Sequence, residues 1–389
     1  MKVLHLSGSL SRAGGGLHSA LIGLLPAQQR VGVSNEIHGL RDAEWDLDRP
    51  GWGNIAVRAH PVSGPAAFGY SAGMLAAALQ TAPDVIHCHG LWKYPSVVGR
   101  RAAAILRVPC VVSPHGMLNA RPLLVSRWRK RLATLLYEGR HVRRASMLHA
   151  LSGDEARSIR RFGYEGPICQ LPNGVVEPTL TALGPPPWRD QLPGETRVLL
   201  YIGRKDPIKN LESLIAAWSA IEREPRRFDD WSLVIAGWGD PAYEARLGEV
   251  ARAAGLRRFA MLGPLYADAK SRALQQADAF ALVSHSEALP MAALEASSYG
   301  LPLLVTPACN LDAAVAQGAA LQVDPAAESI AHGARLLMSM PPGERQAMGA
   351  QGRTLVKARY SWEGIAQRFE RAYAWLLGAS PRPEWVDIR

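Results

Sequence analysis

Short runs of valine, isoleucine and leucine alternate with longer helical patterns along nearly the whole chain. Continuous apolar runs of this kind are typical of strands that are buried on both faces. The predicted strands span residues 3–6, 85–87, 111–113, 147–150, 198–202, 233–236, 280–283 and 303–305. Because helices join most of these strands, we expect parallel sheets with helices on both faces, which defines an α/β fold.

A proline-rich stretch divides this alternation into two series. Pro178 and the run from Gly184 to Pro187 cannot continue a helix or a central strand, and the second series begins at Val198. We therefore expect two doubly wound, Rossmann-like domains over residues 1–180 and 181–360, which face each other across a cleft. Residues 361–389 form a C-terminal helix and tail, and the helix, predicted over 362–377, can pack on either domain.

The cysteines and the apolar segments indicate a compartment. Cys88, Cys110, Cys169 and Cys309 are scattered in apolar contexts, as buried thiols of a reducing compartment are. No run of about 18 apolar residues could span a membrane, and the first residues are too polar for the core of a signal peptide. We therefore expect a cytoplasmic protein.

The net charge of +10 is concentrated in one block, from Arg121 to Arg144. Apolar side chains recur within this block at helical spacing, which predicts a basic amphipathic helix. The recurring residues are Leu124, Trp128, Leu132, Leu135 and Leu136. The stripe can pack on its own domain, or it can lie on an anionic membrane surface. No motif for nucleic acid accompanies it, so we expect no nucleic-acid partner.

Glycines follow the first strand, from Ser7-Gly8-Ser9 to Gly14-Gly15-Gly16. Glycines ahead of a helix allow backbone amides to approach a phosphate or a sugar closely. The spacing does not match the dinucleotide-binding fingerprint, and a plain flexible turn explains it equally well.

Two cations follow the first strand of the second series. Arg204 and Lys209 lie five residues apart, at the carboxyl end of a strand, where they can converge on one diphosphate. A basic turn that is capped by Pro207 and Asn210 is the equally simple alternative.

Two carboxylates follow the strand at 280–283. Glu287 lies in the loop, Pro290 starts a helix, and Glu295 falls in the second turn of that helix. A buried glutamate needs a partner, which a sugar or ribose hydroxyl can supply. The amides of Leu289 and Met291 at the start of the helix can bind phosphate oxygens.

This segment resembles the signature of a known family. Glu287 and Glu295, followed by the stretch from Tyr299 to Thr306, look like the signature of the retaining glycosyltransferases of family 4 (group 1), which have the GT-B fold. Other stretches agree in order: Gly15-Gly16, Asp84 to Gly90, Ser113 to Met117, Pro172 to Val175, Gly203-Arg204 with Lys209, and Ala236 to Gly239. The resemblance covers residues 1 to about 377.

The resemblance implies a nucleoside diphosphate sugar as co-substrate, with no metal and no further cofactor. Arg204 and Lys209 would hold the diphosphate, Glu295 the ribose, and Glu287 the transferred sugar. On the donor side, Gly15, Gly16, Ala288 and Leu289 would add contacts, and His115 would approach the sugar from the first, acceptor-side domain. Retention by front-face attack would let the leaving diphosphate accept the proton of the acceptor.

Three details limit or reject other interpretations. Ala288 stands where the family usually has glycine, which puts the donor contacts at that point in question. Asp46-Leu47-Asp48 resembles a metal-binding motif but lacks a preceding apolar strand, so we expect a solvated loop. His87, Cys88 and His89 suggest zinc, but alternation along a strand points Cys88 away from both histidines. We expect satisfied histidines instead, and His89 can also lie near the acceptor.

The preferred hypothesis is transfer of a hexosyl unit to a lipid-linked glycan acceptor in the synthesis of exopolysaccharide or lipopolysaccharide. The enzyme would then be cytoplasmic and peripheral on the inner face of the membrane. The same fold also suits a nucleotide-sugar epimerase or a synthase with a soluble acceptor. A non-enzymatic protein that binds nucleic acid is a third hypothesis.

Overall fold

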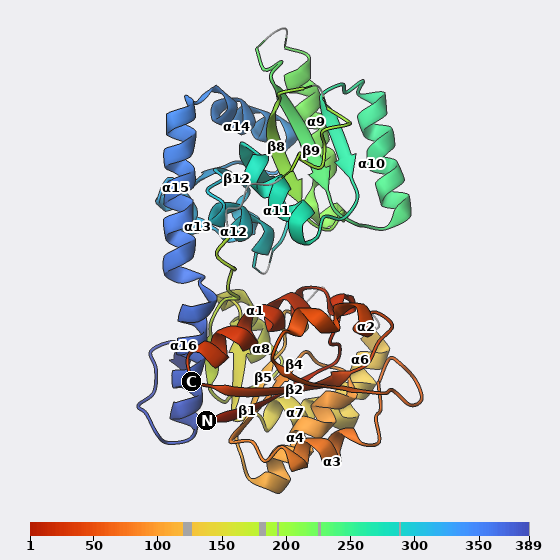
Figure 1. Ribbon diagram of the computed structural model, residues 1–389, viewed down its shortest axis with the longest axis vertical. Helices are drawn as coiled ribbons and strands as arrows, with labels where there is room; N and C mark the ends of the chain where they lie inside the picture. The colour runs from red at the N-terminus through yellow and green to blue at the C-terminus, as the bar shows by residue number, and fades with distance from the viewer. Residues whose placement is uncertain (120–126, 179–183, 193, 225–226, 288, 389) are drawn as a thin grey trace. The chain divides into compact units, whose positions relative to one another are not determined.

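The chain divides into two compact units. The computed structural model describes residues 1–119, 127–178, 184–192, 194–224, 227–287 and 289–388. Unit 1 comprises Met1–Gly174 and Trp362–Arg389, and unit 2 comprises Val175–Ser361. The chain therefore leaves unit 1 at Gly174, before Pro178, and returns to it after Ser361 (Figure 1).

Unit 1 contains a sheet with the strand order β14-β7-β6-β5-β4-β1-β2-β3. The strands are β1 (Lys2–Ser7), β2 (Ser34–Leu40), β3 (Ala56–His60), β4 (Val85–His89), β5 (Cys110–Ser113), β6 (Met147–Ala150), β7 (Ile168–Gln170) and β14 (Val386–Asp387). Neighbouring strands are parallel, except that β14 is antiparallel to β7. The order reverses between β1 and β4, and ligands of such sheets bind at this switch point.

Helices cover both faces of this sheet. They are α1 (Gly16–Arg30), α2 (Trp45–Asp48), α3 (Met74–Gln80), α4 (Tyr94–Leu106), α6 (Arg127–Ala133), α7 (Gly139–Arg143), α8 (Gly153–Arg161) and α16 (Trp362–Leu376). Strand alternation separates two cores: Val3 and Val85 pack towards α1 and α16, whereas Leu4, Ile86 and Cys88 pack towards α3 and α4. Cys88 therefore faces away from His87 and His89, as predicted.

Helix α16 completes unit 1. Figure 1 shows this blue helix beside the red α1, and its Phe369 and Tyr373 are buried in the same core as Leu21 and Leu25 of α1. A Cβ atom on Gly23 would lie 2.1 Å from the Trp362 ring, so the two helices are in close contact. The sequence left the partner of this helix open, and the structure assigns it to unit 1.

Unit 2 contains a parallel sheet with the strand order β10-β9-β8-β11-β12-β13. Its strands are β8 (Arg197–Ile202), β9 (Trp231–Ala236), β10 (Phe259–Leu262), β11 (Ala279–Leu282), β12 (Leu303–Val305) and β13 (Ala320–Gln322). Its helices are α9 (Leu211–Glu222), α10 (Pro241–Ala253), α11 (Ala267–Gln276), α12 (Met291–Ser298), α13 (Asp312–Ala316), α14 (Ala327–Ser339) and α15 (Pro342–Arg359). The order reverses between β8 and β11, which places a second switch point there.

One local prediction is wrong, and a second is confirmed for its described part. The segment with Asp46 and Asp48 is one turn of helix α2, and Asp48 is buried rather than solvated. Asp48 accepts hydrogen bonds from the Arg12 backbone (2.6 Å) and from Arg12 Nε (2.8 Å), so it fixes the loop after β1. Of the predicted basic helix, residues 121–126, with Leu124, lie outside the described residues. The part over 127–143 is helical, and a π-helical segment, Thr134–Glu138, joins α6 to α7 within it.

No helix within the described ranges has both the length and the apolar character that a bilayer crossing requires.

Gly349 in α15 provides a test of the packing in unit 2. A Cβ atom at this buried glycine would lie 1.8 Å from the Gly300 carbonyl oxygen. Overpacking of this kind costs about 1–3 kcal/mol, which exceeds the helix propensity that alanine gains. We expect Gly349→Ala to lower the denaturation midpoint, measured by circular dichroism.

Gly343→Ala in the same helix is the matched control. Its Cβ atom would meet nothing within 4 Å. This variant should be neutral or up to about 1 kcal/mol more stable. Equal effects of both substitutions would contradict the close contact at Gly349.

Candidate active site

Lys209 and Glu287 meet at the switch point of unit 2. Lys209 Nζ lies 2.6 Å from Glu287 Oε1, and Ser284 Oγ donates to the same oxygen at 2.7 Å. Their side chains are only 17% and 10% exposed, respectively. A buried charge is stable only when it is paired and hydrogen-bonded, so each of these two charges depends on the other.

The strand order explains why these residues meet although they are far apart in the sequence. Lys209 ends the turn after β8, and Glu287 follows β11, which is the neighbour of β8. The backbone amide of His285 donates to the Ile208 carbonyl oxygen (2.8 Å), and Asn310 Nδ2 donates to the Glu287 carbonyl oxygen (2.8 Å). The two loops are therefore fixed to each other, and the ion pair has a rigid support.

Arg204 lies at the same strand end, but it is half exposed. Its Nη2 is 3.3 Å from Asp206 Oδ2, and its carbonyl oxygen accepts from the Tyr201 hydroxyl at 2.8 Å. An exposed ion pair contributes little free energy. The guanidinium can therefore exchange Asp206 for another anion at low cost.

Glu295 lies on α12, as predicted, and is paired with a residue that the sequence analysis missed. Its carboxylate forms an ion pair with Lys270 of α11. Leu289 lies just before α12, and its carbonyl oxygen accepts from the Met291 amide at 2.9 Å. The Met291 amide is therefore already engaged, contrary to the prediction that it is available to a phosphate oxygen. Ala288 lies outside the described residues.

The loops after β8, β9 and β10 are tied together by backbone contacts. The Gly203 amide donates to the Ala236 carbonyl oxygen, and the Gly237 amide donates to the Gly263 carbonyl oxygen. A Cβ atom on Gly237 would lie 1.8 Å from the Gly203 carbonyl oxygen, so only glycine fits there. Lys205, which sequence analysis did not single out, is buried and donates to the Leu262 carbonyl oxygen at 2.9 Å.

The glycine loop of unit 1 lies at the other switch point. Gly15 has φ +56° and is the N-cap residue of α1, which starts at Gly16. No side chain caps this start of the helix. A cavity of about 210 Å³ opens beside this loop, between the ends of β1 and β4. Lys93, which sequence analysis missed, lines this cavity and donates from Nζ to the Gly8 carbonyl oxygen at 3.2 Å.

His115 follows β5 in an unusual backbone conformation. Its φ is +52°, and that of Gly116 is +78°. The buried Glu155 of α8 accepts from the Gly116 amide (2.6 Å) and from the Leu151 amide (2.9 Å). Burial raises the pKa of Glu155, and these two bonds hold the turn that carries His115.

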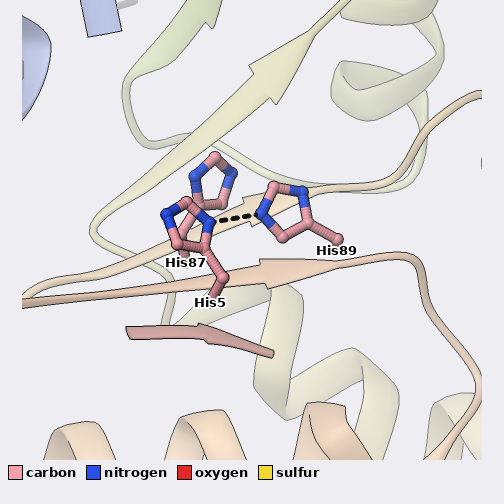
Figure 2. A group of neighbouring side chains, drawn as sticks. All are labelled: His5, His87 and His89. Atoms are coloured by element: carbon pink, nitrogen blue, oxygen red, sulfur yellow. Dashed lines mark hydrogen bonds between the residues drawn. The ribbon is translucent and has the colours of Figure 1, made fainter. Parts of the chain in front are cut away.

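Three buried histidines, His5, His87 and His89, lie close together (Figure 2), and His89 Nδ1 is 3.3 Å from His115 Nε2. One nitrogen of each lies within 4.8 Å of the others, as a metal site would require. All six ring nitrogens nevertheless have partners: Asn35, His115, Tyr373 and Ser113, in addition to the bond between His5 and His89. The geometry therefore agrees with the prediction that His87 and His89 are satisfied histidines.

Burial keeps these rings neutral. It lowers the pKa of His5 and of the neighbouring His149 to about 4 and that of His115 to about 3. The pKa values of His87 and His89 also lie well below the ordinary value, because burial disfavours the charged ring.

Comparison with known families agrees with this geometry. Residues 15–174 match the model of the glycosyl transferase 4-like domain, and residues 187–355 match the model of glycosyl transferases group 1. The chain thus belongs to the group 1 glycosyltransferases of family 4 and has the GT-B fold.

Three proteins that resemble this chain share between 21% and 30% sequence identity with it. A D-inositol 3-phosphate glycosyltransferase of Nocardiopsis dassonvillei is 30% identical over 63% of this chain, and the match spans 60% of that protein. The GDP-mannose:cellobiosyl-diphosphopolyprenol alpha-mannosyltransferase of Komagataeibacter xylinus is 26% identical over 97% of this chain and 94% of its own length. The crystal structure of HepE from Anabaena, in complex with UDP and glucose, superposes with a TM-score of 0.73 at 21% identity, over 96% of this chain and 99% of that chain.

The neutral histidines predict how unit 1 responds to acid. In an unfolded chain histidine titrates near pH 6.5, so below that pH the unfolded state binds protons that the folded unit excludes. Stability should therefore fall as pH drops from about 6.5 towards 4, by up to about 1.4 kcal/mol per histidine and pH unit. Glu138, whose pKa burial raises to about 7, and Glu155, whose pKa burial also raises, act in the opposite direction, but the buried histidines of unit 1 outnumber them.

Thermal unfolding at pH 7.5 and pH 5.5 tests this prediction. The transition of unit 1 should shift strongly. That of unit 2 should shift less, because its His285 and His332 are exposed. Equal shifts of both transitions would contradict the conclusion that the buried histidines of unit 1 are neutral.

Proposed function

We propose that this protein transfers a hexosyl unit from a nucleoside diphosphate sugar to a glycan acceptor. The observation that carries the proposal is the rigid pair of Lys209 and Glu287 at the switch point of unit 2, with Arg204 at the same strand end. Two similar proteins support this class. The Komagataeibacter protein is named as a mannosyltransferase, and the Anabaena HepE structure is a complex with UDP and glucose.

In this proposal the diphosphate replaces the present partners of the two cations. A phosphate oxygen would take the place of Glu287 on Lys209, and another would take the place of Asp206 on Arg204. Glu287 would then be released towards the sugar hydroxyls, and Glu295 would accept from the ribose. The cations gain most where negative charge develops on the leaving diphosphate. We therefore propose that the reaction requires no metal.

We further propose that the configuration at the anomeric carbon is retained. The acceptor hydroxyl would attack from the face that the diphosphate leaves, and the diphosphate would take the hydroxyl proton. His115 would contact the sugar, while Gly15 and Gly16 would lie along the phosphates or the acceptor. Ala288 and Leu289 would contribute contacts at the start of α12.

Lys209→Ala tests the donor site. Removing one charge that stabilises a leaving group costs about 10²–10³-fold in kcat. We expect such a loss, and with it the loss of the thermal shift that a nucleoside diphosphate sugar gives to wild type with metal chelated. A donor at 100 times its Kd should stabilise wild type by about 2.7 kcal/mol.

Lys357→Ala, which removes an exposed lysine of the same unit, is the control and should behave as wild type.

Steady release of nucleoside diphosphate distinguishes transfer from epimerisation, which releases none. Transfer to a soluble glycan alone would favour a synthase. Salt-sensitive binding of DNA or RNA without sugar-nucleotide affinity would favour the non-enzymatic hypothesis.

We propose a lipid-linked acceptor, reached at an anionic membrane surface on the cytoplasmic side, in exopolysaccharide or lipopolysaccharide synthesis. Within α6 and the π-helical segment the apolar stripe is exposed: Trp128 by 67%, Leu132 by 51%, Leu135 by 80% and Leu136 by 65%. These side chains are therefore not packed on unit 1, and exposed arginines flank them. Basic and apolar groups on one helix suit an anionic bilayer surface. The diphosphopolyprenol acceptor in the name of the Komagataeibacter relative supports the same class.

Replacing both Leu135 and Leu136 by glutamine tests the membrane surface. Each buried leucine contributes about 1.5 kcal/mol or more, so the pair should weaken binding to anionic vesicles by about 100-fold in a sedimentation assay. Leu336→Gln, at an exposed leucine of unit 2, is the control. If the wild-type protein does not bind anionic vesicles at low salt, the proposed role at a membrane surface is contradicted.

A further inference from the structure

We infer that Asn35, His5 and His89 form a hydrogen-bonded relay that holds His115 in the tautomer protonated at Nε2, with Nδ1 as an acceptor. In this assignment the three residues are positioning residues for the glycosyl transfer, so their role in catalysis depends on the function proposed above. The tautomer itself does not depend on that function.

The sheet brings the rings together. His5 and His87 are paired in register on the parallel strands β1 and β4, and His89 follows His87 by two residues, on the same face. Asn35 comes from β2, on the other side of β1. Figure 2 shows the rings of His5 and His89 pointing towards each other, with the hydrogen bond between them.

Asn35 gives the relay its direction. Its Nδ2 donates to the Leu25 carbonyl oxygen at 2.9 Å, so its Oδ1 is the atom that faces His5. Oδ1 lies 3.3 Å from His5 Nε2 and can only accept. His5 therefore carries its proton on Nε2.

The remaining protons follow from neutrality. A neutral His5 accepts at Nδ1, so His89 Nε2, at 2.9 Å, carries the proton of the second ring. His89 then accepts at Nδ1, so His115 Nε2, at 3.3 Å, carries the proton of the third ring. His115 Nδ1 is left with its lone pair, and it makes no hydrogen bond to any described residue.

A second chain determines the other rings independently. The Leu171 carbonyl oxygen accepts from His149 Nε2 at 2.7 Å, so His149 Nδ1 accepts from Ser113 Oγ at 2.8 Å. Ser113 in turn accepts from His87 Nε2, and His87 Nδ1 accepts from the Tyr373 hydroxyl, both at 2.7 Å. Both nitrogens of His87 are thereby engaged, so His87 cannot alter the tautomer of the first chain.

The backbone of His115 is held as firmly as its ring. A positive φ at a residue other than glycine costs about 1 kcal/mol, and surrounding contacts must maintain it. Glu155 supplies them through the amide of Gly116. Backbone and ring together direct one acceptor nitrogen, which suits a sugar or acceptor hydroxyl as hydrogen-bond donor. The opposite tautomer would present an N–H group and could not accept that bond.

His5→Phe is the variant that tests the relay, because it keeps a ring and removes both nitrogens. His141→Phe is its matched control, since His141 is equally buried in unit 1 and takes no part in either chain. His5→Asn is the conservative variant, because its side-chain oxygen can accept from His89 near the place of Nδ1. Asn35→Leu provides a second break in the relay if His5→Phe does not fold.

Ring nitrogen spectra (long-range ¹H–¹⁵N NMR) report the tautomer directly. We expect His115 to be protonated at Nε2 in wild type, His5→Asn and His141→Phe, and to populate both tautomers in His5→Phe or Asn35→Leu. Protonation of wild-type His115 at Nδ1, or no change in the relay variants, would overturn the inference.

Kinetics report the positioning role. We expect His5→Phe to lower kcat by about 10-fold or more, which is the usual effect of removing the orienting partner of a functional histidine. The donor KM and the donor-induced thermal shift should stay within twofold, and His5→Asn should restore kcat. A changed tautomer with unchanged kcat would refute the positioning role. Absence of transfer by wild type, with the tautomer as assigned, would instead refute the proposed function.

Discussion

Both candidate sites depend on the same geometric constraint. Where the strand order of a parallel sheet reverses, the two connections leave the central strands in opposite directions, and the carboxyl ends of those strands stay uncovered. In unit 2 this occurs between β8 and β11, and the uncovered ends carry Lys209 and Glu287. In unit 1 it occurs between β1 and β4, which carry the glycine loop and His89. The fold thus determines where polar groups gather, and the loop sequences determine what they do.

The two units stabilise buried polar groups in different ways. Unit 2 uses opposite charges, so its site is neutral as a pair. Unit 1 uses neutral imidazoles linked to amides, hydroxyls and carbonyl oxygens. Such a network loses free energy whenever one member lacks a partner, so it favours one arrangement of protons. The network of unit 1 therefore holds its rings in a fixed orientation.

The sequence predicted the strands whose residues are uniformly apolar, such as β11 and β12, because burial on both faces requires that composition. It did not predict β2, where Asn35 and His38 are buried, so the apolar pattern is interrupted. Lys209 and Glu287 were each singled out from their position after a strand, but not as a pair, because contact across 78 residues depends on strand order. The link between His5 and His89 likewise follows from the register of β1 and β4, which no local pattern encodes.

The return of α16 to unit 1 has a consequence for how the chain matures during synthesis. Unit 2 is in effect inserted between the two parts of unit 1, and Phe369 and Tyr373 are translated after all of it. Until these residues emerge from the ribosome, the apolar side chains beneath α1 lack their packing partners in α16, and His87 Nδ1 lacks its hydrogen-bond donor, the Tyr373 hydroxyl. Domains generally fold as they are made, N-terminal first. Here the domain that starts first must finish last, so the nascent unit 1 exposes apolar surface for as long as unit 2 takes to translate.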